Sequence, residues 1–334
     1  MKSALHAWLQ RVWYEDSATG VLLRPLSWIY ECLVRLRYAL YRKGWLPASD
    51  IGRPVVVVGN LSVGGTGKTP LTLWLATQLQ SLGLRPGIVL RGYGGSARSA
   101  RLVTPESTVE EVGDEALLLA RRSRCPVAIG SNRVAAGRQL LSRNVQIVIA
   151  DDGLQHLRLK RVAEIVVIDG ERRFGNRRLL PSGPLREPLT RLADVDLLVV
   201  NGERVEQAEI AMGLEADIAL SVVGGSRRAL EHFAPGPVHA LAAIGNPRRF
   251  FRMLEDHGLR VIPHALPDHF ALTREDLEFG DSLPVLMTEK DAVKCERFAD
   301  QRHWFVPVEA VLGERERRAL LDLVLGRAGL GPVR

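Results

Sequence analysis

Cysteine is scarce in this sequence. Its 334 residues include three cysteines, Cys32, Cys125 and Cys295, which lie far apart and never at C-x-x-C spacing. Disulfide frameworks and cysteine zinc sites both require several cysteines at short, regular spacings. The sequence therefore argues against both and is typical of a protein that folds in a reducing compartment.

Long apolar runs are also missing. No stretch approaches the roughly 18 uninterrupted apolar residues that a membrane-spanning helix requires. The N-terminus lacks the compact apolar segment and small-residue cleavage site of a secretory signal, so we expect none. The composition is otherwise ordinary for a globular protein, with 46% hydrophobic and 25% charged residues, and the length suffices for two domains or one large one.

The most informative segment that is present is rich in glycine. It follows four consecutive valines at 55–58 and leads into a helical pattern. A buried strand, a glycine-rich turn and a helix that begins with Gly-Lys-Thr make up the phosphate-binding loop of nucleoside triphosphatases. In such a loop the backbone N–H groups bind phosphate oxygens, the lysine reaches the β- and γ-phosphates, and the threonine ligates Mg²⁺. The residues expected to bind the nucleotide are Ser62, Val63, Gly64, Gly65, Thr66, Gly67, Lys68 and Thr69.

Ser62 departs from the common pattern, which has glycine at that position. The neighbouring Gly64-Gly65 pair partly compensates, because it supplies flexibility two residues later. The alternative is a glycine-rich turn without a ligand, although all of the strand and helix context that the motif requires is present.

The sequence after this loop alternates between strand and helix patterns. The alternation predicts an α/β fold, with a mostly parallel sheet of the P-loop NTPase type covered on both faces. The run at 145–150 is almost continuously apolar, so we expect it to be a central strand. Ligands of such sheets bind at the carboxyl ends of the strands. Further strands are expected at 88–90, 127–129, 165–168 and 197–200.

A change of composition after Asn201-Gly202 ends this pattern. Turn residues become frequent, and strand patterns then resume, which predicts a second, smaller α/β domain. The predicted division is an N-terminal helical segment at 1–45, a P-loop core domain at 46–203 and a C-terminal domain at 204–334.

The first 45 residues concentrate positive charge and tryptophan. They hold seven basic and three acidic residues and four of the six tryptophans of the chain. Apolar residues recur at helical spacing from Leu26 to Leu40, with Arg35 and Arg42 elsewhere on the helix. Basic amphipathic helices with tryptophan bind anionic membrane surfaces, so we predict membrane association. A helix packed on the protein's own core is the alternative, and no nucleic-acid fold signature supports nucleic acid as a partner.

Two acidic clusters are candidates for chemistry. Asp151-Asp152 directly follows the expected central strand, where P-loop enzymes place the carboxylate linked to magnesium. We therefore expect Asp151 and Asp152, with Thr69, to hold the metal; a turn or helix cap is the structural alternative. Asp114-Glu115 opens a helix, a position that the helix dipole alone makes favourable for acidic residues.

Arginine-rich segments lie beyond several of the strands. Arg91-Gly92-Tyr93-Gly94 can place a cation and an aromatic ring over the site, and Asn132-Arg133 opens the next helix. The proline-locked loop at 181–188 contains Arg186. Such a loop either clamps an anionic substrate or is merely solvated.

Two motifs stand out in the expected second domain. The Asp268-His269 pair has no G-x-S-x-G serine nearby, so hydrolase chemistry has little support. Thr288-Glu289-Lys290-Asp291 follows a strand, as the guanine-reading N-K-x-D segment of GTPases does. The asparagine of that segment is absent here, which favours adenine.

In combination, these segments resemble the tetraacyldisaccharide 4′-kinases, the lipid A 4′-kinases of Gram-negative bacteria. The resemblance spans roughly residues 15 to 300 in the same order, and serine or threonine at position 62 is usual in that family. The motifs that carry it are at 59–70, 91–94, 112–115, 151–156, 181–187 and 287–294.

The resemblance implies a kinase that uses ATP and Mg²⁺ to phosphorylate the 4′-hydroxyl of a tetraacylated glucosamine disaccharide 1-phosphate, giving lipid IVA. It implies a peripheral protein at the cytoplasmic face of the inner membrane, with its N-terminal helix on the bilayer and no obligate protein partner. Asp114 and His269 then correspond to a dyad that takes the proton from the sugar hydroxyl, while Lys68 neutralises phosphate charge. The residues expected to contact the substrate are Arg91, Tyr93, Glu115, Arg133, Gln155, His156 and Arg186.

Two other functions are compatible with parts of the sequence. One is a P-loop ATPase or GTPase that switches a protein partner, as metallochaperone-like and protein-targeting relatives do. The other is a peripheral membrane-binding module with a vestigial nucleotide site. Phosphoryl transfer to a lipid separates the kinase from both.

Overall fold

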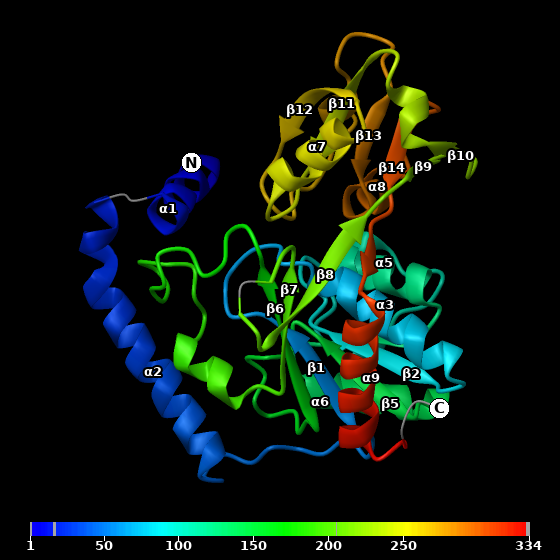
Figure 1. Ribbon diagram of the computed structural model, residues 1–334. Helices are drawn as coiled ribbons and strands as arrows, with labels where there is room; N and C mark the ends of the chain where they lie inside the picture. Colours follow the sequence, from blue (N-terminus) through cyan, green and yellow to red (C-terminus); the bar gives the residue numbers. More distant parts are fainter. Residues whose placement is uncertain (1, 16–17, 205, 332–334) are drawn as a thin grey trace.

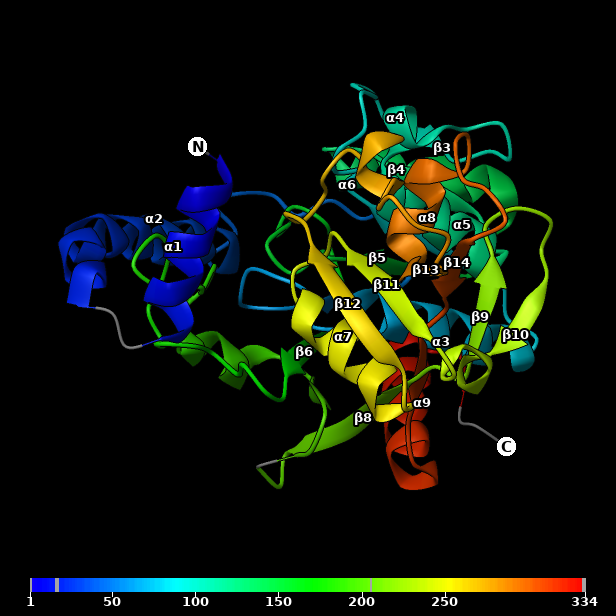
Figure 2. The same cartoon turned by 90° about the horizontal axis from the view of Figure 1, so that it is seen from above.

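A computed structural model describes residues 2–15, 18–204 and 206–331 of the chain. These residues form two β-sheets with helices packed on them, the smaller sheet above the larger one in Figure 1. A helical N-terminal segment lies beside the larger sheet, at the left of both Figure 1 and Figure 2.

The larger sheet carries the predicted phosphate-binding loop. Within the described ranges its strand order is β15-β8-β7-β6-β1-β5-β2-β4-β3. Neighbours from β8 to β4 run parallel, whereas the edge strands β15 and β3 pair antiparallel. The strands are β1 (Val55–Gly59), β2 (Pro86–Leu90), β3 (Arg101–Leu102), β4 (Val127–Ile129), β5 (Ile147–Asp151), β6 (Ala163–Asp169), β7 (Leu197–Asn201), β8 (Glu209–Glu215) and β15 (Glu309–Val311).

Strand β1 lies inside this sheet because its side chains are buried on both faces. Its four valines at 55–58 are at most 1% exposed, and it pairs with β5 on one side and β6 on the other. β-Branched residues suit a parallel strand that is covered by helices on both faces. The expected central strand at 145–150 corresponds to β5, the direct neighbour of β1.

Helices cover both faces of the larger sheet. Leu75 of α3, Leu117 of α5 and Leu321 of α9 share one buried cluster with Val56. Val134 of α6 belongs to the cluster on the other face. The helices of this unit are α3 (Lys68–Ser81), α4 (Val109–Val112), α5 (Asp114–Ser123), α6 (Arg133–Leu140), η2 (Leu141–Arg143), η3 (Leu189–Asp194) and α9 (Glu314–Ala328).

The smaller sheet has the strand order β10-β9-β14-β13-β11-β12. Strands β14, β13, β11 and β12 are parallel, and β9 pairs antiparallel with both β14 and β10. Its elements are β9 (Ile218–Ser221), β10 (Arg227–Ala229), η4 (Leu230–Phe233), β11 (Pro237–Ala242), α7 (Pro247–Asp256), β12 (Arg260–Ala265), η5 (Glu275–Leu277), β13 (Val285–Thr288), α8 (Glu289–Cys295) and β14 (His303–Val306).

The chain passes between the two sheets twice. Strand β8 of the larger sheet continues into β9 of the smaller one, and β14 continues back into β15 (Figure 1). Helix α9 then packs on the larger sheet through Leu320 and Leu321. Strands β8 and β15 and helix α9 therefore belong with the larger sheet although all three follow residue 204. The predicted division of the chain at 203–204 stays a prediction.

The N-terminal segment consists of α1 (Lys2–Tyr14), η1 (Ala18–Leu23) and α2 (Arg24–Arg42). The predicted segment 1–45 also includes residues 1, 16 and 17, which lie outside the described residues. Helix α2 is tied to the core by the Ser27 hydroxyl, which donates to the Leu179 carbonyl at 2.9 Å, and by the Tyr30 hydroxyl, which donates to the Arg186 carbonyl at 3.0 Å.

The rest of α2 presents large apolar side chains to solvent. A search of the described residues finds no helix with both the length and the apolar character needed to cross a membrane. Solvent-exposed apolar residues are nevertheless concentrated here, at Val21, Leu22, Leu26, Trp28, Ile29, Leu33, Leu36 and Trp45.

Candidate active site

The predicted phosphate-binding loop connects β1 to α3 at the carboxyl end of the larger sheet. Gly64 and Gly67 have φ angles of 111° and 98°, in the left-handed region that side chains other than glycine rarely adopt. Helix α3 begins at Lys68, so its unpaired N–H groups face the loop. The loop therefore has the backbone geometry of an anion-binding site.

The proline-locked loop at 181–188 is paired with the phosphate-binding loop. This pairing holds Arg186 beside the site, and the loop is therefore not simply solvated. Backbone contacts join Ser62 to Leu185 in an antiparallel bridge, the Val63 N–H to the Pro184 carbonyl at 2.8 Å, and the Arg186 N–H to the Leu61 carbonyl at 2.6 Å.

Asp151 and Asp152 lie at the carboxyl end of β5, next to the loop. Oδ1 of Asp151 accepts a hydrogen bond from the Thr72 hydroxyl at 3.1 Å, and its Oδ2 accepts one from the Thr69 hydroxyl at 3.5 Å. Asp152 forms an ion pair with Lys68 at 3.7 Å. The structure thus brings the predicted lysine, threonine and both carboxylates together.

The two carboxylates differ in their electrostatic surroundings. Burial, followed by the charge of Glu115, raises the pKa of Asp151 to about 7. Burial also opposes ionisation of Asp152, but Lys68 and Arg186 outweigh it and lower the pKa of Asp152 below its usual range. Nη1 of Arg186 lies 3.0 Å from both carboxylate oxygens of Asp152. Asp152 is therefore an anion. A further cation bound beside Asp151 would lower the pKa of Asp151 and favour its ionised form.

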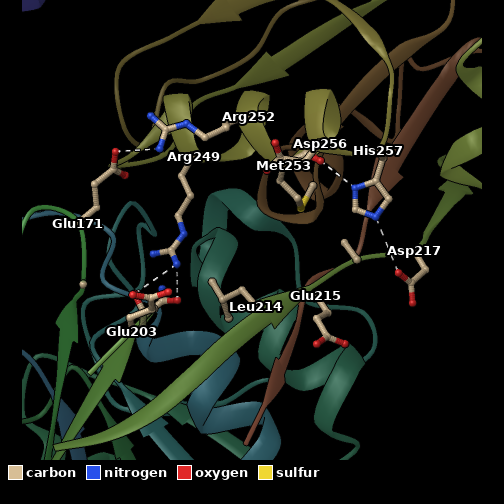
Figure 3. A pocket seen from close by; sticks show the side chains of 14 residues that line it. Glu171, Glu203, Leu214, Glu215, Asp217, Arg249, Arg252, Met253, Asp256 and His257 are labelled. Carbon is tan, nitrogen blue, oxygen red and sulfur yellow. Dashed lines mark hydrogen bonds and ion pairs between the residues drawn. The ribbon is translucent and has the colours of Figure 1, made fainter. Parts of the chain in front are cut away.

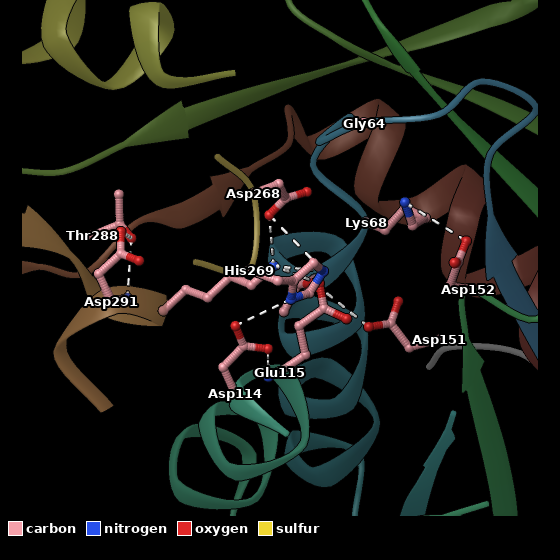
Figure 4. A network of polar contacts seen from close by, with 12 residues as sticks. Gly64, Lys68, Asp114, Glu115, Asp151, Asp152, Asp268, His269, Thr288 and Asp291 are labelled. Atoms are coloured by element: carbon pink, nitrogen blue, oxygen red, sulfur yellow. Dashed lines mark hydrogen bonds and ion pairs between the residues drawn. The ribbon is translucent and has the colours of Figure 1, made fainter. Parts of the chain in front are cut away.

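Asp114 and His269 meet between the two sheets. Asp114 is the first residue of α5, and Nδ1 of His269, on the loop after β12, is 3.2 Å from its Oδ2 (Figure 4). The Tyr93 ring lies 4.6 Å from the imidazole, centroid to centroid. His269 has a φ of 58°, a strained value for a residue with a side chain and one that is found at functional sites.

Asp114 is a buried carboxylate that stays ionised. Burial alone raises its pKa, but the hydrogen bond from His269 and the charges of Lys290 and Lys294 outweigh burial and lower the pKa to about 2. The backbone N–H of Glu115 donates to Oδ1 of Asp114 at 2.8 Å. The carboxylate therefore acts as an acceptor of hydrogen bonds at neutral pH.

Lys290 and Lys294 are residues of this site that sequence reasoning missed. We interpreted their segment as a possible base-reading motif, but the structure places it in α8, against α5. Nζ of Lys294 lies 3.5 Å from Asp114, and Nζ of Lys290 lies 3.1 Å from Glu115 and 3.4 Å from Nε2 of His269. The motif can be recognised in the sequence, but its contacts with Asp114 and Glu115 of α5 cannot.

Several of the predicted substrate-binding residues gather around Asp152. Nη2 of Arg133 donates to the backbone carbonyl of Asp152 at 3.2 Å. The side-chain oxygen of Gln155 accepts from Nη1 of Arg186 at 3.2 Å, and its amide nitrogen donates to Glu187 at 2.8 Å. This network fixes the direction of each group, which a flexible loop would not do.

His156 and Arg91 complete this basic cluster. Burial, followed by the charge of Arg133 and further arginines, lowers the pKa of His156 to about 4, so its ring is neutral at pH 7. Its Nε2 is buried and has no hydrogen-bond partner in the described structure. Burial, with a smaller effect of the charge of Arg91, lowers the pKa of Arg133. The cluster combines excess positive charge with an unsatisfied polar atom, as expected of a site for an anionic ligand.

A sequence model of the tetraacyldisaccharide-1-P 4′-kinases matches residues 19–326 of the chain. The chain belongs to this family. The predicted family is thereby confirmed, and the alternatives of a nucleotide-dependent switch and of a membrane module with a vestigial site are not favoured.

Curated proteins named tetraacyldisaccharide 4′-kinase are similar to this family member over most of their length. The protein of Nitrosococcus oceani is 48% identical over 304 residues, 90% of each chain. That of Alkalilimnicola ehrlichii is 52% identical over 298 residues, 86% of this chain and 87% of its own. That of Methylobacillus flagellatus is 46% identical over 330 residues, 98% of this chain and 97% of its own.

A solved structure of the family confirms the predicted α/β fold. The crystal structure of "apo" form LpxK from Aquifex aeolicus in complex with ATP has a TM-score of 0.76 and 27% sequence identity, and the match covers 93% of this chain and 99% of that one. The mostly parallel sheet agrees with this fold.

In this kinase family member the phosphate-binding loop also touches the smaller sheet's unit, a contact the sequence did not reveal. Gly65 packs against the backbone of Gly245. A Cβ atom added to Gly245 would overlap the backbone nitrogen of Gly65. Nδ2 of Asn201, at the end of β7, donates to the Thr66 carbonyl at 3.1 Å, and Nη2 of Arg249 donates to Oδ1 of Asn201 at 2.6 Å. Glycine at position 245 thus permits the close approach of two backbones.

A cavity of about 500 Å³ opens beside this junction, between the end of the larger sheet and α7 (Figure 3). Asn201 and Arg249 line it and also take part in the junction, so the cavity adjoins the phosphate-binding loop. Leu214 and Met253 supply apolar lining. A carboxyl-end cleft of this size is the usual position of a ligand in a parallel α/β sheet.

Gly245→Ala is expected to displace the phosphate-binding loop, because the added Cβ atom overlaps backbone that cannot move independently. The affinity for ATP, measured by calorimetry, should fall roughly tenfold or more, in line with the cost of misplacing a binding loop. Gly236→Ala is the matched control, since nothing lies within 4 Å of a Cβ atom there. Equal ATP affinity of both variants would contradict the importance of this contact.

Proposed function

We propose that this chain transfers the γ-phosphoryl group of ATP to the 4′-hydroxyl of a tetraacylated glucosamine disaccharide 1-phosphate, giving lipid IVA. The observation that carries the proposal is that a phosphate-binding loop and the Asp114–His269 pair lie close together in a member of this kinase family. In Figure 4, Lys68 and Asp152 lie on one side of this group of residues and Asp114 on the other.

The phosphate-binding loop would hold and neutralise the triphosphate. Its backbone N–H groups and the start of α3 would bind the β- and γ-phosphates, and Lys68 would place its charge on them. The ion pair of Lys68 with Asp152, at 3.7 Å, supports this role because it keeps the ammonium at the mouth of the loop. Little covalent work is left for the protein, since phosphoryl transfer depends on alignment and charge neutralisation.

The residues around Asp151 fit a magnesium ion. A threonine hydroxyl and carboxylate oxygens are the hard ligands that Mg²⁺ prefers, usually one or two from the protein with phosphate and water for the rest. Thr69 and Asp151 would bind the ion directly, and Asp152 would contact it through a water molecule. A magnesium ion held there would supply positive charge against the phosphate oxygens.

Asp114 would accept the proton of the sugar hydroxyl. It is the ionised, buried carboxylate on the acceptor side of the cleft, and His269 orients it through the 3.2 Å contact. A pKa of about 2 makes it a weak base, which suffices for a dissociative transfer in which the hydroxyl proton leaves late. Because its two members come from different units, a motion that separates the units would take the pair apart.

The basic cluster would bind the anionic disaccharide. Arg133 and Arg186 are held in place by Asp152, and the unpaired Nε2 of His156 offers a further polar contact. Arg91 and Tyr93 lie on the exposed loop after β2, where they can reach a large substrate. Glu115, which follows Asp114 at the start of α5, would contact the substrate beside Asp114.

The nucleoside of ATP would occupy the cavity between β7 and α7. The cavity adjoins the phosphate-binding loop through Asn201, and Leu214 and Met253 give its otherwise mostly polar lining an apolar patch against which a purine ring can pack. Met253→Trp should fill part of it and raise the Kd for ATP by roughly tenfold, as steric exclusion from a pocket does. Met253→Leu, with a similar volume, should bind ATP normally. If ATP binds the tryptophan variant as tightly as the leucine variant, the nucleoside lies elsewhere.

The protein would work as a peripheral enzyme at the cytoplasmic face of the inner membrane. Leu26, Ile29, Leu33 and Leu36 recur at spacings of three and four, so they share one face of α2, and each is more than half exposed. Trp28 and Trp45 are exposed nearby, and basic residues flank them. An acylated substrate would reach the cleft from the bilayer on which this face rests.

Replacement of Leu26, Ile29, Leu33 and Leu36 by serine should reduce sedimentation with anionic phospholipid vesicles by at least tenfold, because each apolar side chain contributes about 25 cal/mol per Å² that it buries. The matched control replaces the exposed Leu82, Leu141, Val223 and Val311 by serine. Unchanged sedimentation of the α2 variant would rule out this face as the membrane contact.

Asp114→Asn should lower kcat for ATP-dependent phosphorylation of the tetraacylated disaccharide 1-phosphate by roughly a hundredfold or more, the usual contribution of a general base. Lys68→Ala should abolish the transfer almost completely. Asp322→Asn, on the exposed surface of α9, is the control. A wild-type kcat for Asp114→Asn would remove Asp114 from its role. ATP hydrolysis that proceeds at the same rate without lipid would instead favour the switch.

A further inference from the structure

Lys290 lies at the centre of the contacts between the two units. Its ammonium is 3.1 Å from Oε1 of Glu115, 3.2 Å from Oδ1 of Asp268 and 3.4 Å from Nε2 of His269. The side chain is 13% exposed, so these three groups are its surroundings. Glu115 belongs to the larger sheet's unit, whereas Asp268 and His269 belong to the loop after β12.

The chemistry of an ammonium group decides how these contacts are made. Lysine has three donors and no acceptor, so Nε2 of His269 can only accept from it. Burial lowers the pKa of Lys290, but Glu115, Asp268 and Asp114 outweigh burial and raise it above its ordinary value, so the group keeps its charge. A neutral imidazole has one N–H, which must then lie on Nδ1. Nδ1 is the nitrogen that faces Asp114.

We propose that Lys290 is a positioning residue, which fixes the neutral His269 tautomer with its proton on Nδ1 and so aims that proton at Asp114. With Nε2 occupied by a cation, His269 does not itself take the hydroxyl proton; it orients the carboxylate that does. The assignment of Asp114 as the proton acceptor rests on the proposed kinase function, whereas the tautomer rests on the contacts of Lys290 alone.

The docking of the two units does not depend on Lys290. Helices α5 and α8 are also joined by ion pairs of Arg122 with Glu289, at 2.6 Å, and of Arg121 with Glu296. Arg122→Met is therefore a matched control: it removes an ion pair between the same two helices without touching His269. Lys290→Met keeps the length and the buried stem of the side chain and removes the charge.

Replacement of Lys290 by methionine removes the ammonium group that faces Nε2 of His269. Asp114 and Glu115 from α5 and Asp268 from its own loop would remain, with Lys294 of α8 as the remaining cation and Tyr93 against the ring. Without the ammonium, Nε2 of His269 can carry the ring proton and face Oδ1 of Asp268, which lies 3.9 Å away. Nδ1 then has no proton to donate to Asp114.

Nitrogen-15 NMR of the histidine-labelled full-length protein tests the tautomer directly, with the signal of His269 identified by its loss in His269→Gln. At pH 7.5 the wild-type protein and Arg122→Met should show a protonated Nδ1 and an unprotonated Nε2. Lys290→Met should show the other tautomer, with the proton on Nε2. A wild-type signal with the proton on Nε2, or the wild-type pattern in Lys290→Met, would overturn the proposal.

The kinetic counterpart is the separation of kcat from KM. Lys290→Met should lose roughly tenfold in kcat with the KM for ATP unchanged, because the fault is in proton placement. A rise in the KM for ATP that accompanies the loss of kcat would mark Lys290 as merely structural. The NMR result does not require catalysis, so a failure of the kinase function and a failure of this proposal are distinguishable.

Discussion

The hydrogen bond between Asp114 and His269 joins two parts of the chain that are 155 residues apart and belong to different sheets. A carboxylate in the cleft cannot stay ionised without such help, because burial alone favours its neutral form. His269 and the two lysines of α8 reverse this effect. The acceptor side of the site therefore exists only where the smaller sheet's unit rests on α5.

At the phosphate-binding loop, a close contact between two glycine backbones also joins the two units. The phosphate-binding loop meets Gly245 directly, and Asn201 and Arg249 connect the same loop to α7. The two contacts, α8 on α5 and Gly245 on Gly65, lie at different places along the boundary between the units, and the cavity of Figure 3 opens beside the second of them. The proposed nucleotide and acceptor sites thus both lie between the same two units.

Features encoded by local pattern were predictable from the sequence. Four valines and the Gly-Lys-Thr turn predicted β1, the loop and the start of α3, and the apolar run at 145–150 predicted β5 and the carboxylates after it. Contacts between distant segments were not. Strands β8 and β15 and the return of α9 depend on pairing across about a hundred residues, which no local periodicity records. Lys290 stood in a recognised motif, yet its neighbours Glu115 and His269 follow from the arrangement of the two units.

The route of the chain between the sheets limits how the units can move. The smaller unit leaves the larger sheet through β8 and returns through β15, and these two strands are hydrogen-bonded to each other as an antiparallel pair. The joint is thus a two-stranded ribbon, and both crossings lie together at the β15–β8 edge of the larger sheet. The position of His269 relative to Asp114 therefore depends on the geometry of this one edge.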